Sequence, residues 1–251
     1  HSQSLESWFT HIPGVKVVAP GTPADVKGLL KSSIRDNNPV IFLEYKAQYN
    51  MKGEVPTDPE FIIPLGKGEI KKEGKDITIV TYGRMLERVM KAAEIAESEG
   101  ISVEVVDPRT LIPLDKEIIL NSVKKTGRVI LVNDAHKTSG FIGEISAIIS
   151  ESDTFDYLDH PIVRLAGEDV PMPYNHTLET AMVPSVEKIV EAIRKVKNKK
   201  SFLNLSIVRF TVNHFGEWVD FTIEKLRLLK EVFYEWINQN WSKRRATISK
   251  W

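Results

Sequence analysis

The polar segment at the start of the chain holds the first residues that could do chemistry. His1 is followed by Ser2, Gln3 and Ser4, and this polar run precedes an apolar run of strand length. An imidazole titrates near neutral pH, so it can accept and return a proton during a reaction. Loops of this kind can carry functional groups. Residue types and spacing alone nevertheless favour a histidine without a catalytic role.

A second candidate is the turn from Ser33 to Pro39, which ends a predicted helix. The last carbonyl groups of a helix have no partner within the helix, so they can bind a cation. Asp36 and Asn38 can instead form hydrogen bonds within a turn. Residue types alone favour this second interpretation, a helix end without an ion.

Other motifs that would indicate a self-contained active site are absent from the sequence. It contains no G-x-G-x-x-G segment, no Walker loop, no H-E-x-x-H and no G-x-S-x-G. No two histidines are spaced as metal ligands, so a structural or exposed role is expected for His11, His136, His160, His176 and His214. Metal catalysis by this chain alone is therefore not expected.

The composition is that of an ordinary globular protein. The 251 residues include 34 basic and 34 acidic residues, and none is cysteine. The absence of net charge gives no general attraction to nucleic acid, and no apolar run is long enough to span a bilayer. We expect a soluble, cytoplasmic protein, located in the mitochondrial matrix if the source is eukaryotic, with no nucleic-acid or membrane partner.

The first part of the chain predicts a βαβ unit. Strands are expected at 15–18 and 40–43, with a helix between them that begins after Thr22 and Pro23. Threonine is a good helix N-cap and proline a good first helical residue. Two strands joined in this way should be parallel and buried on both faces.

A second α/β series follows residues 51–75, a stretch rich in glycine and proline that is interpreted as a linker. Glycines end several of the predicted helices, as in an open, mostly parallel sheet covered on both faces. Strands are predicted at 77–82, 102–106, 129–132 and 162–165, and helices at 84–99, 115–126, 143–151 and 185–197. These elements define a three-layer α/β domain over residues 76–197.

The last 54 residues differ in composition from the rest. Four of the five tryptophans lie there, and apolar residues recur at helical spacing between Val219 and Trp236. We predict an aromatic, partly helical extension over residues 198–251, which docks on its own domain or on a partner. Its role is unknown.

Five separated segments, in order and in register, resemble the beta subunit of the thiamine-diphosphate-dependent decarboxylating component of 2-oxoacid dehydrogenase complexes, of the pyruvate or branched-chain type. The segments are HSQSLESWFTHIPG at 1–14, 15–20 with the following helix, RDNNPVIFLE at 35–44, VVDPRTLIPLD at 105–115 and DVPMPY at 169–174. The resemblance covers residues 1–197. It implies that residues 1–50 are the C-terminal half of a thiamine pyrimidine-binding domain and that 76–197 are a transketolase-type C-terminal domain.

The resemblance also implies functional residues. In the family, the histidine of the H-S-Q loop lies beside the thiazolium ring of the cofactor, which makes His1 the expected catalytic and cofactor-binding residue. The family's structural potassium site falls on the backbone carbonyls of Ser33, Ile34 and Asn38 and on Asp36. The implied reaction is oxidative decarboxylation of a 2-oxoacid, followed by acyl transfer to the lipoyl-lysine of an acyltransferase core.

The same resemblance implies what must come from outside this chain. The glutamate that activates the pyrimidine lies upstream of the H-S-Q loop in the family, and the alpha subunit of an α2β2 heterotetramer holds the diphosphate and its magnesium. We therefore expect activity only with a complete N-terminal part and an alpha subunit. A noncatalytic dimerisation or docking module, and another thiamine enzyme of transketolase type, are the alternatives.

Overall fold

The computed structural model describes residues 3–198, 210–211 and 218–219. The chain divides into two units, His1–Lys199 and Lys200–Trp251. In the second unit, β9 (Phe210–Thr211) and β10 (Trp218–Val219) form an antiparallel pair. Val219 thus lies in a strand, and its assignment to a helix was wrong. The rest of the predicted aromatic helix lies outside the described residues.

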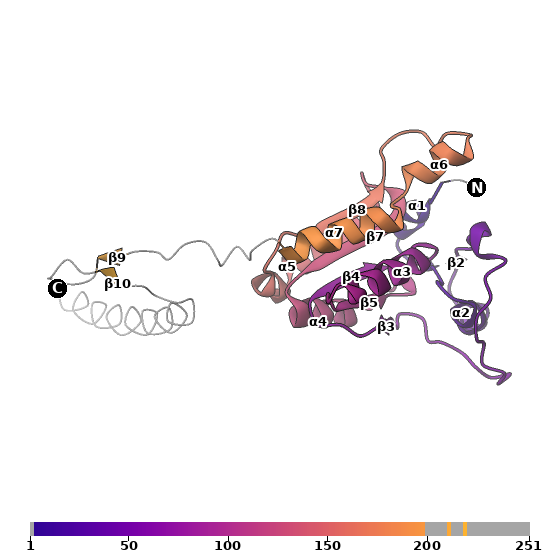
Figure 1. The fold of residues 1–251 in the computed structure, drawn as a ribbon. Helices are drawn as coiled ribbons and strands as arrows, with labels where there is room; N and C mark the ends of the chain where they lie inside the picture. The colour runs from indigo at the N-terminus through magenta and orange to yellow at the C-terminus, as the bar shows by residue number, and fades with distance from the viewer. Residues whose placement is uncertain (1–2, 199–209, 212–217, 220–251) are drawn as a thin grey trace, which may run out of the picture. The chain divides into compact units, whose positions relative to one another are not determined.

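A five-stranded sheet forms the centre of the first unit (Figure 1). Its strand order is β3-β5-β4-β7-β8. The last four strands in this order are parallel, and only β3 runs antiparallel to its neighbour. The bounds are β3 Glu69–Lys72, β4 Ile77–Thr81, β5 Val103–Asp107, β7 Val129–His136 and β8 Val163–Gly167. The predicted mostly parallel sheet is confirmed.

Helices cover both faces of this sheet, which makes the predicted three layers. On one face, α3 (Met85–Ser98) packs beside α7 (Val186–Asn198), over strand residues that include Ile77 and Ile79 (Figure 1). On the other face, α4 (Lys116–Thr126) and α5 (Phe141–Glu151) pack on Val80 and Leu131. Alternate residues of a strand point to opposite faces, so each central strand contributes to two cores.

A second, three-stranded sheet contains the predicted βαβ unit. Strand β1 (Lys16–Val18) pairs in parallel with β2 (Val40–Phe42), and α2 (Pro23–Arg35) connects them. The Thr22 hydroxyl accepts a hydrogen bond from the Asp25 amide, 3.2 Å away, which confirms the predicted cap. Burial differs from the expectation, because β2 is only half-buried along its length.

Several short elements were not expected. Strand β6 (Thr110–Ile112) pairs antiparallel with β1, and β3 lies within residues 51–75, where no regular element was predicted. The short helices α1 (Glu6–Thr10) and α6 (His176–Met182) and the 3₁₀ turns η1 (Lys46–Gln48) and η2 (Asp153–Tyr157) complete the described elements of this unit. Within the part of the chain that the structure describes, no helix has the length and apolar character needed to cross a bilayer.

Candidate functional site

The segment after the H-S-Q sequence borders a cavity at the carboxyl edge of the large sheet. His1 and Ser2 lie outside the described residues, so the structure does not place the predicted catalytic histidine. The cavity has a volume of about 690 Å³ and is lined by Gln3, Ser4, Leu5, Glu6, Phe9, Leu43, Glu44, Tyr45, Lys46, Ala47, Arg84, Asp134 and Glu179. Ligands bind at this edge in many open α/β sheets.

Glu6, the first residue of α1, is the most buried carboxyl group of this cavity. Only 1% of its surface is exposed. The Tyr82 hydroxyl donates a hydrogen bond to Glu6 Oε1 over 3.0 Å, and Asn133 Nδ2 lies 3.4 Å from the same oxygen. Asn133 Nδ2 also donates to the Tyr82 hydroxyl oxygen over 2.9 Å. Tyr82 follows β4 and Asn133 belongs to β7, so Glu6 connects α1 to two adjacent strands.

An ion pair lies next to this network. Arg84 Nε donates to the carboxylate of Asp134, whose side chain is almost fully buried. Burial raises the pKa of Glu6 to about 7, and the negative charge of Asp134 adds to the increase. The hydrogen bonds from Tyr82 and Asn133 offset part of it. Glu6 therefore exchanges its proton near neutral pH.

Tyr45 closes the cavity from the side of the smaller sheet. Its hydroxyl is buried and finds no hydrogen-bond partner among the described residues. Burial, together with the charge of Glu6, raises the pKa of Tyr45 well above its usual range. The ring lies against Gly83, which has a φ of +58° and no room for a Cβ atom. Glycine is required at position 83 for both reasons.

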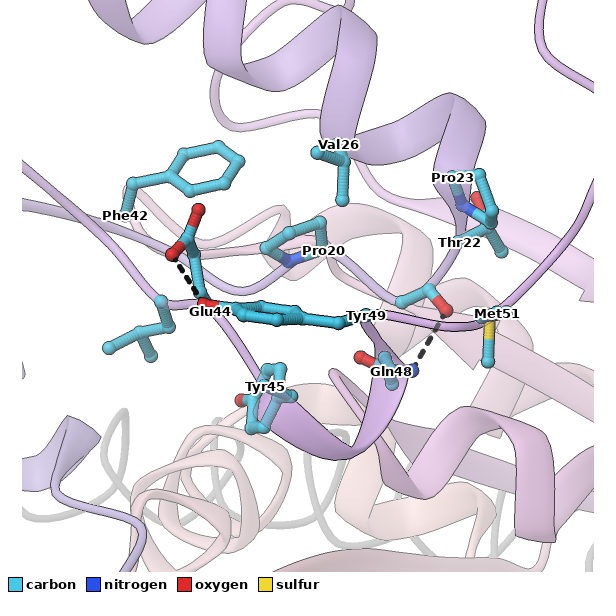
Figure 2. A pocket seen from close by; sticks show the side chains of 12 residues that line it. Pro20, Thr22, Pro23, Val26, Phe42, Glu44, Tyr45, Gln48, Tyr49 and Met51 are labelled. Carbon is cyan, nitrogen blue, oxygen red and sulfur yellow. Dashed lines mark hydrogen bonds between the residues drawn. The ribbon is translucent and has the colours of Figure 1, made fainter. Parts of the chain in front are cut away.

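Figure 2 shows a second cavity, which Tyr45 also lines. It has a volume of about 430 Å³, and most of its lining is apolar, from residues such as Pro20, Val26 and Phe42. Two hydrogen bonds cross it in Figure 2: Tyr49 donates to Glu44 over 2.9 Å, and Gln48 donates to the Gly21 carbonyl over 3.3 Å. Leu43, Glu44 and Tyr45 line both cavities.

The predicted potassium turn is held together by its own side chains. Asp36 Oδ1 accepts hydrogen bonds from the amide and the side chain of Asn38, over 2.8 and 2.9 Å. Lys16 Nζ lies 2.5 Å from Asp36 Oδ2. These contacts, with that of Lys16 first, lower the pKa of Asp36 to about 2. The Asp36 carboxylate is thus neutralised by an ammonium group already, and a potassium ion would depend mainly on backbone carbonyls.

At least one of the backbone carbonyls proposed to bind potassium already accepts a hydrogen bond. The Ser33 carbonyl accepts a 3.4 Å bond from the Asp36 amide, and the Ser33 hydroxyl donates to Leu29. Ile34 is largely exposed. Among the described residues, no group of three or more His, Asp and Glu side chains is arranged to hold a metal ion. The arrangement fits a hydrogen-bonded turn as well as it fits an ion site.

Sequence reasoning missed the Glu6 network because its members are far apart in the chain. Tyr82 is 76 residues from Glu6, and Asn133 is 127 residues from it. One signal was present: polar residues Asn133 and Asp134 directly follow the apolar run of β7, at the strand end where sites form. No sequence signal distinguished Glu6 from an exposed first-turn glutamate.

Comparison with known protein families agrees with this architecture. The model described as "Transketolase, pyrimidine binding domain" matches residues 1–52, and the model described as "Transketolase, C-terminal domain" matches residues 66–189. A solved structure described as a split-gene transketolase in an inactive beta4 tetramer has the same fold. It has a TM-score of 0.62 and 24% identity, over 77% of this chain and 61% of that one.

Several curated relatives are beta subunits of 2-oxoacid dehydrogenase components. The beta subunit of the mitochondrial pyruvate dehydrogenase E1 component of Dictyostelium discoideum is 46% identical, over 79% of this chain and 56% of its own length. The 2-oxoisovalerate dehydrogenase beta subunit of Bacillus subtilis is 48% identical, over 78% and 60%. The chain is similar to these beta subunits, and its two domain matches place it among proteins with transketolase-type pyrimidine-binding and C-terminal domains. It spans somewhat more than half the length of the relatives it matches.

The matches to known families bear on which cofactor this protein uses. Transketolase-type proteins and the E1 beta subunits imply thiamine diphosphate as the cofactor. The described residues next to the H-S-Q sequence supply a buried acid, an ion pair and two tyrosines. These groups can bind, orient and exchange protons, and they lie where residues 3–9 meet the large sheet.

Glu6→Gln should make stability less dependent on pH. The folded state raises the pKa of Glu6 from 4.5 to about 7, so it binds the proton more tightly than the unfolded state does. Stability contributed by Glu6 is complete at low pH and is lost as pH rises from 4.5 to about 7. Gln does not titrate, so we expect the variant to gain up to about 3 kcal/mol relative to the wild type between about pH 5 and pH 8.

Urea unfolding at the two pH values measures this difference. Glu94→Gln is the control, since Glu94 is exposed on α3. Its stability difference from the wild type should be the same at both pH values. An equally constant difference for Glu6→Gln would contradict the raised pKa.

Gly83→Ala should destabilise the protein more than Gly100→Ala. Both glycines have positive φ, +58° and +77°, so each alanine has a backbone cost of about 1–2 kcal/mol. Only the Cβ at position 83 overlaps the Tyr45 ring, since nothing lies within 4 Å of a Cβ at position 100. This overlap should add about 1–3 kcal/mol. Equal losses in thermal or urea unfolding would show that Tyr45 does not pack on Gly83 in solution.

Proposed function

We propose that this chain is part of the beta subunit of a 2-oxoacid dehydrogenase component that decarboxylates a 2-oxoacid and transfers the acyl group to a lipoyl group. The observation that carries the proposal is the cavity at the carboxyl edge of the sheet, which the residues after the H-S-Q sequence line and which holds the buried acid Glu6 with its raised pKa. The relatives named above point to pyruvate or a branched-chain 2-oxoacid as the substrate class.

The overall reaction sets the work that side chains must do. The bond between the carboxylate and the carbonyl carbon breaks, and CO₂ leaves. Thiamine diphosphate supplies the electron sink that holds the electron pair left on the substrate. This pair then reduces the lipoyl disulfide: one sulfur takes the acyl group, and the other leaves as a thiol after it gains a proton.

We assign to His1 the step that delivers a proton to the leaving sulfur. An imidazole near the reacting atoms can hold a proton at neutral pH and deliver it as the sulfur–sulfur bond breaks. Acyl transfer requires a pocket that excludes water, because water would compete with the lipoyl sulfur for the acyl group. Leu5, Phe9 and Leu43 contribute the apolar part of the cavity lining, beside its polar and charged groups.

The remaining parts of the enzyme lie outside this chain in the proposal. A complete N-terminal part supplies the pyrimidine-activating glutamate, and an alpha subunit in an α2β2 heterotetramer supplies the diphosphate site with its magnesium. A lipoyl acyltransferase core receives the acyl group. The setting is the cytoplasm, or the mitochondrial matrix if the source is eukaryotic; the name of the Dictyostelium relative describes that protein as mitochondrial.

Two alternatives differ in what they predict. A docking module without chemistry would assemble with an alpha subunit and release no CO₂. A transketolase-type enzyme would use sugar phosphates and would not use 2-oxoacids. The identity of 46–48% to the beta subunits, against 24% to the transketolase structure, supports the dehydrogenase component.

His1→Ala, made in the complete subunit assembled with its alpha partner, should keep assembly and thiamine diphosphate binding. Lipoyl acylation should fall by about 10²–10⁴-fold, the usual contribution of one proton-transfer group. CO₂ release from pyruvate and from 2-oxoisovalerate, with an artificial oxidant in place of the lipoyl group, separates decarboxylation from acylation.

His176→Ala is the matched control, because His176 is an exposed histidine on α6. Its acylation rate should equal that of the wild type. A wild-type assembly that releases no CO₂ from either 2-oxoacid would overturn the proposed function, whereas unchanged acylation in His1→Ala would remove only His1 from the mechanism.

Potassium at the turn of Ser33, Ile34, Asp36 and Asn38 also remains a proposal. If the site binds potassium selectively, KCl should raise the melting temperature more than NaCl at equal ionic strength, because an ion that binds only the folded state stabilises it. Asp36→Asn should reduce the difference between the two salts. Identical melting temperatures in the two salts would leave the turn as a structure held by Lys16 and Asn38 alone.

A further inference from the structure

We propose that Glu6 is a positioning residue for the H-S-Q loop: it ties the end of the loop to the carboxyl edge of the large sheet, and loss of its proton loosens this tie. The inference rests on the proposed function, because it assigns a role within the same site. Its first support is geometric. Glu6 Oε1 accepts from Tyr82 over 3.0 Å, and Asn133 completes a three-membered network with both.

The position of Glu6 in the chain lets it act on the loop. Gln3, Ser4, Leu5 and Glu6 line the same cavity, and Glu6 begins the short helix α1. The N-cap of α1, Leu5, makes no side-chain capping hydrogen bond. Glu6 therefore provides the buried polar anchor at the junction between the loop and α1. Only four residues separate Glu6 from His1 in the sequence, so the anchor lies close to the H-S-Q sequence along the chain.

The charged and titratable groups around Glu6 come from several elements. Asp134 lies on β7, and its partner Arg84 directly precedes α3. Tyr82 follows β4, and Tyr45 precedes η1. Glu44, Lys46 and Glu179 also line the cavity; Glu44 and Lys46 are exposed, and Glu179 is half-buried. The nearby cation, Arg84, is already paired with Asp134, so it does not neutralise Glu6.

Proton binding by Glu6 is linked to the attachment of the loop, and this linkage sets the direction in which pH acts on the attachment. A carboxylate at this place is buried and faces the negative charge of Asp134, which is why the pKa of Glu6 is raised. In any state where α1 and the loop detach, Glu6 becomes solvated and releases its proton more readily. Rising pH therefore favours the detached state. Below neutral pH the protonated group stays in its network, and the loop is held in place.

The pH profile of lipoyl acylation in the assembled enzyme tests this role. In the wild type we expect an alkaline limb that includes the titration of Glu6. In Glu6→Gln, which keeps an oxygen for Tyr82 and Asn133, this limb should move up by about one pH unit or more, and the remaining dependence belongs to other groups. A residue that only stabilised the fold would change the rate equally at every pH.

A second variant, Asp134→Asn, should shift the pH profile in the opposite direction. Asp134→Asn removes the negative charge next to Glu6 and leaves Arg84 positive, so the pKa of Glu6 should fall. The alkaline limb should then move to lower pH. Glu94→Gln, a matched substitution on the outer surface of α3, should leave the profile of the wild type unchanged. Coincident profiles for the wild type, Glu6→Gln and Asp134→Asn would overturn the proposal.

Amide hydrogen exchange of the same assembly separates this inference from the proposed function. After correction for the intrinsic pH dependence of exchange, the peptide that contains residues 3–10 should lose protection several-fold between about pH 6 and pH 8 in the wild type. Glu6→Gln should show no such loss. If the wild type turns over no 2-oxoacid but this difference is present, the proposed function fails and the anchor stands. If protection does not depend on Glu6, the anchor fails whatever the activity.

Discussion

The pairing of β1 with β6 is the constraint on which the arrangement of the site depends. Val17 pairs with Ile112 and Val18 with Thr110, and the Ala19 amide donates to the Arg109 carbonyl over 2.9 Å. These bonds attach the short pyrimidine-binding segment to the C-terminal domain. With β1 fixed in this way, the residues that precede it, including Glu6, lie at the carboxyl edge of the larger sheet.

Buried charges accompany this pairing. Asp25, on α2, lies 2.9 Å from Lys71 on β3 and 3.4 Å from Arg109. Beside it, Asp107 is fully buried, and one of its carboxylate oxygens has no hydrogen-bond partner among the described residues. Burial and then the charge of Asp25 raise the pKa of Asp107 from 3.8 to about 7. The stability contributed by Asp107 and by Glu6 thus decreases as pH rises. Both residues lie where the pyrimidine-binding segment meets the C-terminal domain.

The sequence predicted the regular parts of this structure and not the connections between them. The βαβ unit, the cap at Thr22 and the mostly parallel sheet are confirmed because each follows from local residue patterns. Strand β6 has three residues between Pro108 and Pro113, too few to show periodicity, and it exists because β1 lies beside it. Glu6 could not be recognised for the same reason: its partners are neighbours only after folding.

A comparison of two buried glutamates indicates why Glu6 belongs to the site and not to the core. Glu104 is also fully buried, but both of its carboxylate oxygens are paired: it accepts from Ser122, from Lys125 and, over 3.2 Å, from the Gly74 amide. Among the described residues no cation pairs with Glu6, and the negative charge of Asp134 adds to the increase in its pKa. A buried carboxyl group costs stability unless it is paired, and the fold supplies that pairing at Glu104. At the carboxyl edge the protein instead retains an acid that is hydrogen-bonded but has no cation within the described part of the chain, and perturbed acids of this kind are typical of functional sites.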